Sequence, residues 1–229
     1  HRLDDLPAAP DRAERDRAFD DTLEREGFHV RRMADLTALE QDERYLEGTG
    51  SLVLDRERNV AYAAISPRTS ERALNVWCGV MDGHQVPFLA TMDGTLTGQP
   101  VYHTNVVMSI GEHFAAVCFE AMPYPVDRED VRAELERAGK EVIPFSLDQM
   151  HRYVGNMLQL RGLSLPNSSL AASFIFLSET AFNALKPEQR IALERHGQLV
   201  PVAIPTIETV GGGSVRCMLA ENFLQALGA

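Results

Sequence analysis

A pattern of roughly fifty residues occurs three times along the chain, and this repeat constrains the fold more than any other feature of the sequence. Each copy contains two short apolar segments, then a segment with helical periodicity, and then another apolar segment. This order predicts a ββαβ unit. Such a unit cannot bury its apolar face alone, so we expect the units to stack on one another. The sequence therefore predicts an α/β fold built from ββαβ repeats.

The bounds of the expected elements follow from the apolar segments and the turn residues between them. In the first copy we expect strands over residues 50–55 and 60–65, a helix that ends near Gly79, and a strand over 86–90. In the second copy we expect strands over 106–110 and 114–119, a helix over 127–138, and a strand over 142–145. The third copy predicts strands over 157–160 and 174–177, helices over 178–185 and 187–196, and a strand over 199–202.

Both ends of the chain carry parts of the same pattern. Residues 12–26 are charged and helix-prone, and Gly27 ends this segment before a strand-like stretch over 28–33. These are the helix and strand of a unit whose hairpin is missing, while residues 1–10 form an arm or linker. A fourth copy opens at Thr206 and lacks a closing strand. We therefore expect one domain over 1–229 that is incomplete at its N-terminal side.

The fourth copy contains a candidate nucleophile. A β-branched run from Thr206, three glycines and an apolar pattern of helical period predict a strand, a tight turn and a helix. Cys217 would then lie in the first helical turn, with Ser214 as the N-cap. Unpaired N–H groups at a helix N-terminus favour a thiolate over a thiol. The alternative is that Cys217 is a small buried hydrophobic residue, as single cysteines often are.

Three polar residues occupy equivalent positions in the three copies. Glu47, His103 and Asn156 each precede the hairpin of their copy. In stacked repeats, equivalent positions converge on one end of a common axis, where Cys217 would join them. Taken singly, Glu47 could instead be a capping or solvated turn residue. His103 could be a turn histidine whose hydrogen bonds are satisfied.

Composition narrows the class of partner. The formal net charge of -11 disfavours nucleic acid and anionic membranes as partners, so a small-molecule substrate is expected. Three widely spaced cysteines indicate a reducing compartment, and no apolar run approaches the roughly 20 residues that span a bilayer. We therefore expect a cytoplasmic protein. Neither metal-ligand spacing nor a complete phosphate-binding loop is present, so no metal and no cofactor is expected.

Four short motifs, in order and at the repeat spacing, together resemble the guanidine-modifying superfamily, also called penteins or amidinotransferase-like proteins. The motifs are Leu46-Glu47-Gly48-Thr49-Gly50-Ser51, Tyr102-His103-Thr104-Asn105-Val106, Gly155-Asn156-Met157-Leu158 and Gly211-Gly212-Gly213-Ser214-Val215-Arg216-Cys217. The resemblance covers roughly residues 23–223. It is closest to the branch of arginine deiminase-related or citrulline-utilising hydrolases.

The resemblance implies a pseudo-symmetric five-bladed α/β propeller with its catalytic residues at the centre. It matches Cys217 to the nucleophile, His103 to the general acid/base and Glu47 to the carboxylate. The implied activity is hydrolysis of a C–N bond in a guanidino or ureido compound through a covalent thio-intermediate. An amidinotransferase shares that intermediate and is the second enzymatic interpretation.

Departures from the family pattern bear on the substrate. Asn105 stands where deiminases carry an Asp two residues after the His, and residues 49–51 replace a commoner Gly-Asp. Carboxylates hold guanidinium groups through charge-assisted hydrogen bonds, so the lost negative charge suits a neutral ureido group such as that of citrulline. Arginine-like substrates and citrulline remain alternatives.

Four further residues are candidate substrate contacts. Asn105 and Asn156 are either such contacts or ordinary turn formers. Arg68 could bind a substrate carboxylate or only begin a helix, and Arg216 could do so or be a surface residue.

The missing hairpin leaves several interpretations of the assembly. Family members usually carry a further N-terminal stretch that supplies the hairpin and an acidic substrate-binding residue, and this sequence shows no match to it. The chain would then be a fragment, close its ring between subunits, or form an open propeller. Unpaired strand edges favour a homo-oligomer. A truncated, non-catalytic member that binds a ligand or partner through the same surface is the remaining alternative.

Overall fold

The computed structural model describes residues 21–30, 34–163 and 171–224. The chain divides into two compact units, Leu36–Ala220 and a smaller unit of His1–Asp35 with Glu221–Ala229. In the smaller unit residues 21–25 are helical and Gly27 has a φ of 85°, as expected for a residue that ends a helix. The predicted strand over 28–33 is not formed at His29 and Val30, and residues 31–33 lie outside the described residues.

The first repeat of the larger unit forms a three-stranded mixed sheet. Strands β1 (Val53–Asp55) and β2 (Val60–Ala64) are an antiparallel hairpin, and β3 (His84–Phe88) lies parallel to β2. Helix α3 (Glu71–Met81) makes the crossover between them. It begins where the Ser70 hydroxyl accepts a hydrogen bond from the amide of Ala73, and it ends at Asp82 with a φ of 51°.

The second repeat forms a sheet of the same topology. Its strands are β4 (Met108–Ile110), β5 (Phe114–Val117) and β6 (Glu141–Pro144), with α5 (Pro125–Arg137) as the crossover. Proline is favoured in the first turn of a helix because that turn leaves N–H groups unpaired. Two short helical turns, η3 (Phe119–Ala121) and α6 (Leu147–Met150), flank this sheet.

The third repeat has longer strands than the sequence predicts. Strands β7 (Leu158–Leu163) and β8 (Ala171–Ser178) pair antiparallel, and β9 (Gln198–Val202) lies parallel to β8 after the helices α7 (Glu179–Ala184) and α8 (Pro187–Glu194). The polar stretch 161–172 lies between the two predicted strands, but cross-strand pairing extends into it through Leu163 and Ala171. The ββαβ order is therefore confirmed in all three copies.

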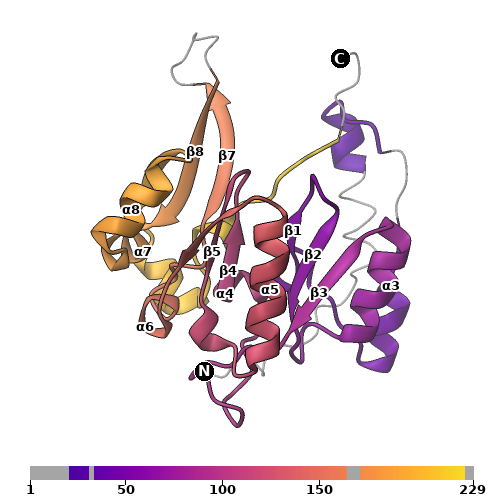
Figure 1. The fold of residues 1–229 in the computed structure, drawn as a ribbon. Helices are drawn as coiled ribbons and strands as arrows, with labels where there is room; N and C mark the ends of the chain where they lie inside the picture. The colour runs from indigo at the N-terminus through magenta and orange to yellow at the C-terminus, as the bar shows by residue number, and fades with distance from the viewer. Residues whose placement is uncertain (1–20, 31–33, 164–170, 225–229) are drawn as a thin grey trace. The chain divides into compact units, whose positions relative to one another are not determined.

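The three sheets lie next to one another in the larger unit, with α3 and α8 at opposite outer sides (Figure 1). The first strand of each sheet lies innermost, because β1 contacts β4 and β4 contacts β7. The middle strands contribute Tyr62, Phe114 and Ile175, each at most 1% exposed, to one continuous hydrophobic core. The described residues form three mixed sheets of an α/β fold.

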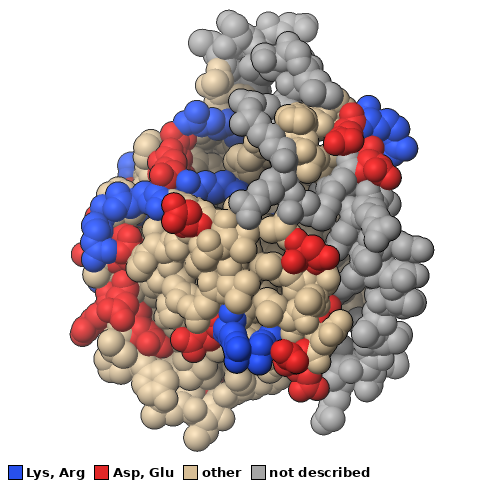
Figure 2. Space-filling view, turned by 90° about the vertical axis from the view of Figure 1, so that its right-hand side faces the viewer, with Lys and Arg blue, Asp and Glu red and all other residues tan. Residues whose placement is uncertain are grey.

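Charged residues are dispersed on the face that Figure 2 presents, which is the right-hand side of the view in Figure 1. Uncharged side chains fill the middle of this face, and acidic and basic side chains lie mostly around it. The net charge of -11 is therefore not gathered into one acidic patch there. Among the described residues no helix has both the length and the apolarity needed to cross a bilayer.

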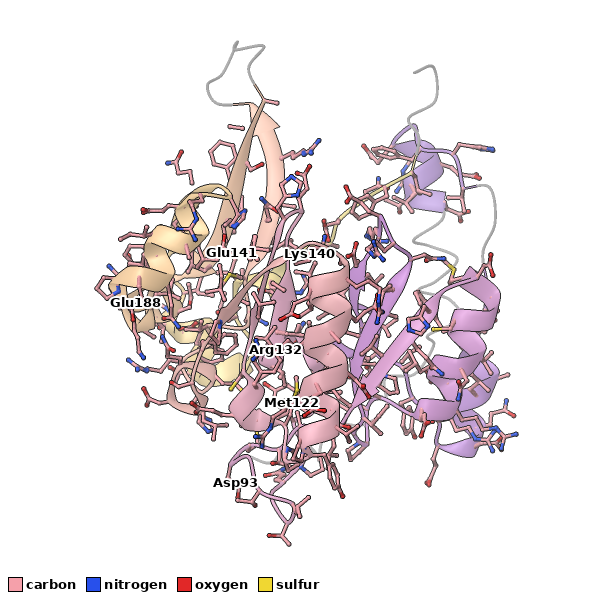
Figure 3. The ribbon with its side chains drawn as sticks, in the orientation of Figure 1. Asp93, Met122, Arg132, Lys140, Glu141 and Glu188 are labelled. Carbon is pink, nitrogen blue, oxygen red and sulfur yellow. The ribbon has the colours of Figure 1, made fainter. Side chains whose placement is uncertain are left out.

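Buried and half-buried ion pairs connect neighbouring repeats. Lys140, between α5 and β6 (Figure 3), places its ammonium 3.3 Å from the Asp55 carboxylate at the end of β1. The Lys140 and Asp55 side chains are 4% and 2% exposed. Glu141 of the second repeat likewise accepts hydrogen bonds from Arg195 and from His196 of the third, the latter at 2.8 Å. These contacts fix the relative position of the repeats and hence of the residues that precede their first strands.

Replacement of Lys140 by Met is predicted to lower the free energy of unfolding by about 3 kcal/mol, because it leaves the Asp55 carboxylate buried and uncompensated. Denaturant unfolding measures this change. The matched control is Arg152→Met, which removes an exposed pair with Asp148 and should cost at most about 1 kcal/mol. Equal losses in the two variants would contradict a structural role for the buried pair.

The Glu141 cluster predicts a pH dependence of stability. The hydrogen bond from His196, and then that from Arg195, lowers the pKa of Glu141 in the folded protein. A carboxyl whose pKa is lowered on folding stabilises the folded state above its unfolded pKa, near 4.5, and loses this contribution as the pH falls further. Glu141→Gln should therefore flatten the fall in unfolding free energy below about pH 5. Glu188→Gln on the exposed side of α8 is the control, and an unchanged slope in Glu141→Gln would contradict the assignment.

Candidate active site

Two of the predicted site residues begin short helices at equivalent places in the fold. Glu47 directly precedes α2 (Gly48–Ser51), which leads into β1, and His103 directly precedes α4 (Thr104–Val107), which leads into β4. Asn156 lies two residues before β7 in the third repeat. Because β1 contacts β4 and β4 contacts β7, the residues that precede these strands lie close together. The predicted convergence of the repeats is thus found in the structure.

Glu47 and His103 form a direct pair. The His103 Nε2 atom lies 2.8 Å from Oε2 of Glu47, and the side chains are 18% and 31% exposed. A guanidinium nitrogen of Arg68 lies 3.7 Å from the same carboxylate oxygen. The guanidinium carbon Cζ of Arg68 lies 5.7 Å from the centre of the Tyr102 ring. The Glu47 carboxylate therefore faces two basic groups of its own chain.

Asn156 contacts Cys217 and the backbone beside it. Its Nδ2 atom lies 3.2 Å from the Cys217 sulfur, and its Oδ1 atom accepts a hydrogen bond of 3.0 Å from the amide of Arg216. Asn156 is 2% exposed, whereas Cys217 is exposed. A buried amide thus holds a surface thiol in place through both of its polar ends.

Asn105 connects these two groups of residues. Its side-chain amide donates to the carbonyl of Thr49 at 3.2 Å, and its backbone carbonyl accepts from Asn156 at 3.4 Å. The side-chain oxygen of Asn105 is buried and accepts no hydrogen bond from any described residue. The group around Glu47 and the group around Cys217 therefore share Asn105 as a neighbour.

A buried network of hydroxyl groups lies beneath Glu47 and His103. The Ser51 hydroxyl accepts from the amide of Glu47 at 2.8 Å and from the hydroxyl of Thr69 at 2.8 Å, and it donates to the Arg68 carbonyl at 2.8 Å. Thr104, next to His103, donates to the Ser51 carbonyl at 2.5 Å. All three hydroxyl residues are fully buried. The network fixes the backbone of Glu47, Arg68 and His103 relative to one another.

The segment around Cys217 differs from the prediction. Residues that were expected to form a strand are a π-helical turn, η4 (Ile207–Gly211), and Cys217 lies in a four-residue 3₁₀ turn, η5 (Val215–Met218), which no helix follows over residues 219–224. Ser214 precedes η5, but its hydroxyl does not cap the turn and donates instead to Glu208. The β-branched run has no partner strand here, and buried polar contacts decide its conformation. So short a turn does not supply the helix N-terminus that the sequence suggested.

Two glycines allow the chain to bring Cys217 to this place. Gly212 has a φ of 68°, which favours glycine, and a Cβ atom on Gly213 would lie 3.4 Å from the Cys217 sulfur. The other two cysteines are buried, and burial raises the pKa of the Cys78 thiol and that of Cys118, the latter to about 12. Cys217 is the exposed thiol among the three.

Two tyrosines that the sequence analysis did not identify also belong to the site. The Tyr102 hydroxyl donates to the carbonyl of Gly212 at 3.1 Å, and that of Tyr153 donates to the carbonyl of Glu208 at 3.0 Å. Burial is the main cause that raises the pKa of both phenols, and Cys217 contributes to each shift. Both phenols remain protonated donors. The repeat spacing gave no signal for them, since Tyr102 stands one residue before His103 and Tyr153 stands three residues before Asn156.

No group of three or more His, Cys, Asp or Glu side chains within the described ranges is arranged to hold a metal ion. The site therefore presents a thiol, an imidazole, a carboxylate and two amides. Such a set can supply a nucleophile, a group that transfers protons, and acceptors for N–H groups of a substrate.

Comparison with protein families identifies the chain. A family model described as "N,N dimethylarginine dimethylhydrolase, eukaryotic" matches residues 3–224. The chain belongs to this family. The guanidine-modifying superfamily that the four motifs indicated is thereby confirmed. No curated protein gives a significant match to this dimethylhydrolase family member.

Solved structures share the fold of this family member. The N-terminal domain of ArgZ with bound product, an arginine dihydrolase from the ornithine-ammonia cycle in cyanobacteria, matches with a TM-score of 0.62 and 14% identity over 96% of this chain and 67% of that domain. The apo structure of ArgZ gives a TM-score of 0.61 at 13% identity, and the chain spans 30% of it. The C315S variant of C. jejuni agmatine deiminase with substrate bound gives a TM-score of 0.50 at 12% identity over 93% of this chain and 63% of that one. At these identities the likeness concerns the fold.

Replacement of Gly50 by Ala in this family member is predicted to displace His103. An added Cβ atom would lie 2.8 Å from the nearest atom of the His103 ring, closer than real contacts allow. The imidazole signals of His103 in two-dimensional NMR spectra should therefore shift. Gly79→Ala on α3, where a Cβ atom meets nothing within 4 Å, is the matched control. Unchanged His103 signals in Gly50→Ala would show that the ring does not pack against Gly50.

Proposed function

We propose that this protein is a cysteine-dependent hydrolase that cleaves a C–N bond of a guanidino or ureido compound through a covalent intermediate on Cys217. The observation that carries the proposal is the convergence of three equivalent repeat positions. These positions supply the Glu47–His103 pair at 2.8 Å and the Asn156 amide at 3.2 Å from the Cys217 sulfur. Membership of the dimethylarginine dimethylhydrolase family supports the reaction class.

Each residue has a defined part in the proposed reaction. Guanidino and ureido carbons are weak electrophiles, so the attacking group is the sulfur of Cys217 as a thiolate. The C–S bond forms, the C–N bond breaks, and the departing nitrogen takes a proton from His103. His103 then accepts a proton from water as its oxygen attacks the same carbon, and the C–S bond breaks. Glu47 orients the imidazole of His103 through the contact of 2.8 Å between Oε2 and Nε2.

Four residues would bind the substrate in this proposal. Asn105 and Asn156 lie between the Glu47–His103 pair and Cys217. Their side chains can form hydrogen bonds with substrate nitrogens there. Arg68, which is 32% exposed on its side chain, can pair with a substrate carboxylate. The backbone amide of Arg216 already donates to Asn156, so in this proposal its side chain, on a residue that is 9% exposed, supplies the contact.

Two substrate classes are compatible with the proposal, cationic guanidino compounds and neutral ureido compounds. Glu47 is the acidic group of the His103 pair and already faces Arg68, and Asn105 adds no charge. This balance suits a neutral ureido group such as that of citrulline. Solved relatives of the same fold include an AgrE variant in complex with L-arginine and an agmatine deiminase with substrate bound, which favour an arginine-like compound.

We further propose that the three repeats belong to a five-bladed propeller within a single domain. The common ββαβ topology and the innermost position of β1, β4 and β7 support this arrangement. Closure of such a ring would require further strands or a second copy of the chain beside the three sheets, because stacked repeats bury their apolar faces only against neighbours.

An assay of C–N hydrolysis tests the proposed function. Arginine, methylated arginines and citrulline are each incubated with the protein, and ammonia or methylamines are measured together with citrulline and ornithine. We expect product from one of these substrates and a loss of at least about 10⁴-fold in kcat for Cys217→Ala, since the nucleophile is removed.

The control for this assay is Cys78→Ala, which removes a buried thiol on α3 that has no part in the proposed reaction and should leave kcat near that of the parent protein. Absence of product from every substrate with folded protein would contradict the hydrolase assignment. Equal activity of Cys217→Ala and the parent protein would contradict the role of the thiol.

A further inference from the structure

Residues 205–218, here called the Cys217 segment, are held by side-chain hydrogen bonds and by the packing of η5 against β8. The last strand, β9, ends at Val202, so the segment takes part in none of the three sheets. Its hydrogen bonds to the repeats come from the hydroxyls of Tyr102 and Tyr153, the amide of Asn156, and the hydroxyl of Thr180 on α7. The position of Cys217 therefore depends on these polar side chains as well as on the contact of η5 with β8.

Glu208 lies at the centre of these contacts and has no part in the chemistry proposed above. Its Oε2 atom accepts a hydrogen bond of 2.6 Å from Thr180, and its Oε1 atom accepts one of 2.8 Å from Ser214. Its backbone carbonyl accepts a further bond of 3.0 Å from Tyr153. Glu208 is 7% exposed and Ser214 is fully buried. Charged acceptors form the stronger hydrogen bonds, so this carboxylate is a firm attachment between α7 and the segment.

The contact of Glu208 with Ser214 leads directly to the thiol. The carbonyl of Ser214 accepts a hydrogen bond of 3.0 Å from the amide of Cys217. Gly213, next to Ser214, lies so close that an added Cβ would come within 3.3 Å of the Cys217 Cβ. Displacement of Ser214 therefore displaces Cys217 from the Asn156 amide.

We propose that Glu208 is a positioning residue, which sets the place of Cys217 through its hydrogen bonds to Ser214 and Thr180. The catalytic part of this inference rests on the proposed function, whereas the positional part does not. Without the carboxylate, the buried hydroxyl of Ser214 and the half-buried hydroxyl of Thr180 lose their acceptor, and the Cys217 segment is free to separate from α7. The fold of the three repeats does not require this attachment.

Native-state proteolysis tests the positional part without any substrate. Arg216 is the one Lys or Arg of the Cys217 segment and is 9% exposed, so trypsin can cut after it only when the segment opens. We expect Glu208→Ala to speed this cut by about tenfold, because the segment loses two hydrogen bonds to a charged group. Mass spectrometry of the fragments identifies the cut.

Two variants control for loss of stability and for loss of charge. Glu134→Ala removes another buried carboxylate, on α5, and should leave the cut after Arg216 unchanged. In Glu208→Gln the side-chain amide still accepts a hydrogen bond from one of the two hydroxyls and donates a hydrogen bond to the other. This variant should therefore be cut at nearly the parent rate. Equal cutting of Glu208→Ala and the parent, or equal acceleration in Glu134→Ala, would overturn the proposal.

Kinetics on the substrate found in the hydrolysis assay test the catalytic part. Glu208→Ala should lower kcat by about 100-fold with KM within about twofold, since misplacement of a reacting group by about 1 Å has this effect. Glu208→Gln should restore kcat to near the parent value. An unchanged kcat in Glu208→Ala, despite faster cutting, would overturn the positioning role, whereas inactivity of the parent protein with a normal proteolysis pattern would count only against the proposed function.

Discussion

Each three-stranded sheet is too small to bury its own apolar face, and the arrangement of the site follows from this constraint. Tyr62, Phe114 and Ile175, one from the middle strand of each sheet, meet in a single core. Their packing brings the first strands together, so that the residues just before those strands become neighbours. Glu47, His103 and Asn156 are separated widely in sequence, and the burial of apolar side chains is what brings them to one place.

Polar contacts then complete what the core begins. The buried hydroxyls of Ser51, Thr69 and Thr104 fix the backbone under Glu47 and His103, and the Lys140–Asp55 pair connects the two repeats to which they belong. Cys217 is different, because its segment lies outside the sheets and is held by side-chain hydrogen bonds together with the contact of η5 with β8. The structure thus combines residues fixed by the core with an exposed thiol, the proposed nucleophile, whose position depends in part on polar side chains.

The ββαβ order of the three repeats could be predicted from the sequence, because apolar periodicity and turn residues are local signals. The convergence of Glu47, His103 and Asn156 followed from their repeat spacing. The prediction of a strand and a helix around Cys217 was wrong. The side-chain hydrogen bond from Ser214 to Glu208 helps to set the conformation there, and apolar periodicity carries no information about such a bond. The strands β7 and β8 were too short in the prediction, because pairing between neighbours extended them through polar residues. Long-range polar contacts such as those of Tyr102 and Tyr153 likewise leave no local pattern.

The central claim is that Cys217 forms a covalent bond to the carbon of a guanidino or ureido substrate. The most direct measurement is rapid acid quenching during turnover, followed by mass spectrometry of the peptides that contain Cys78, Cys118 and Cys217. The account predicts a substrate-derived mass increase on the Cys217 peptide alone, and none on the corresponding peptide of Cys217→Ser. Turnover that leaves Cys217 unmodified at every quench time and persists in Cys217→Ser would contradict it.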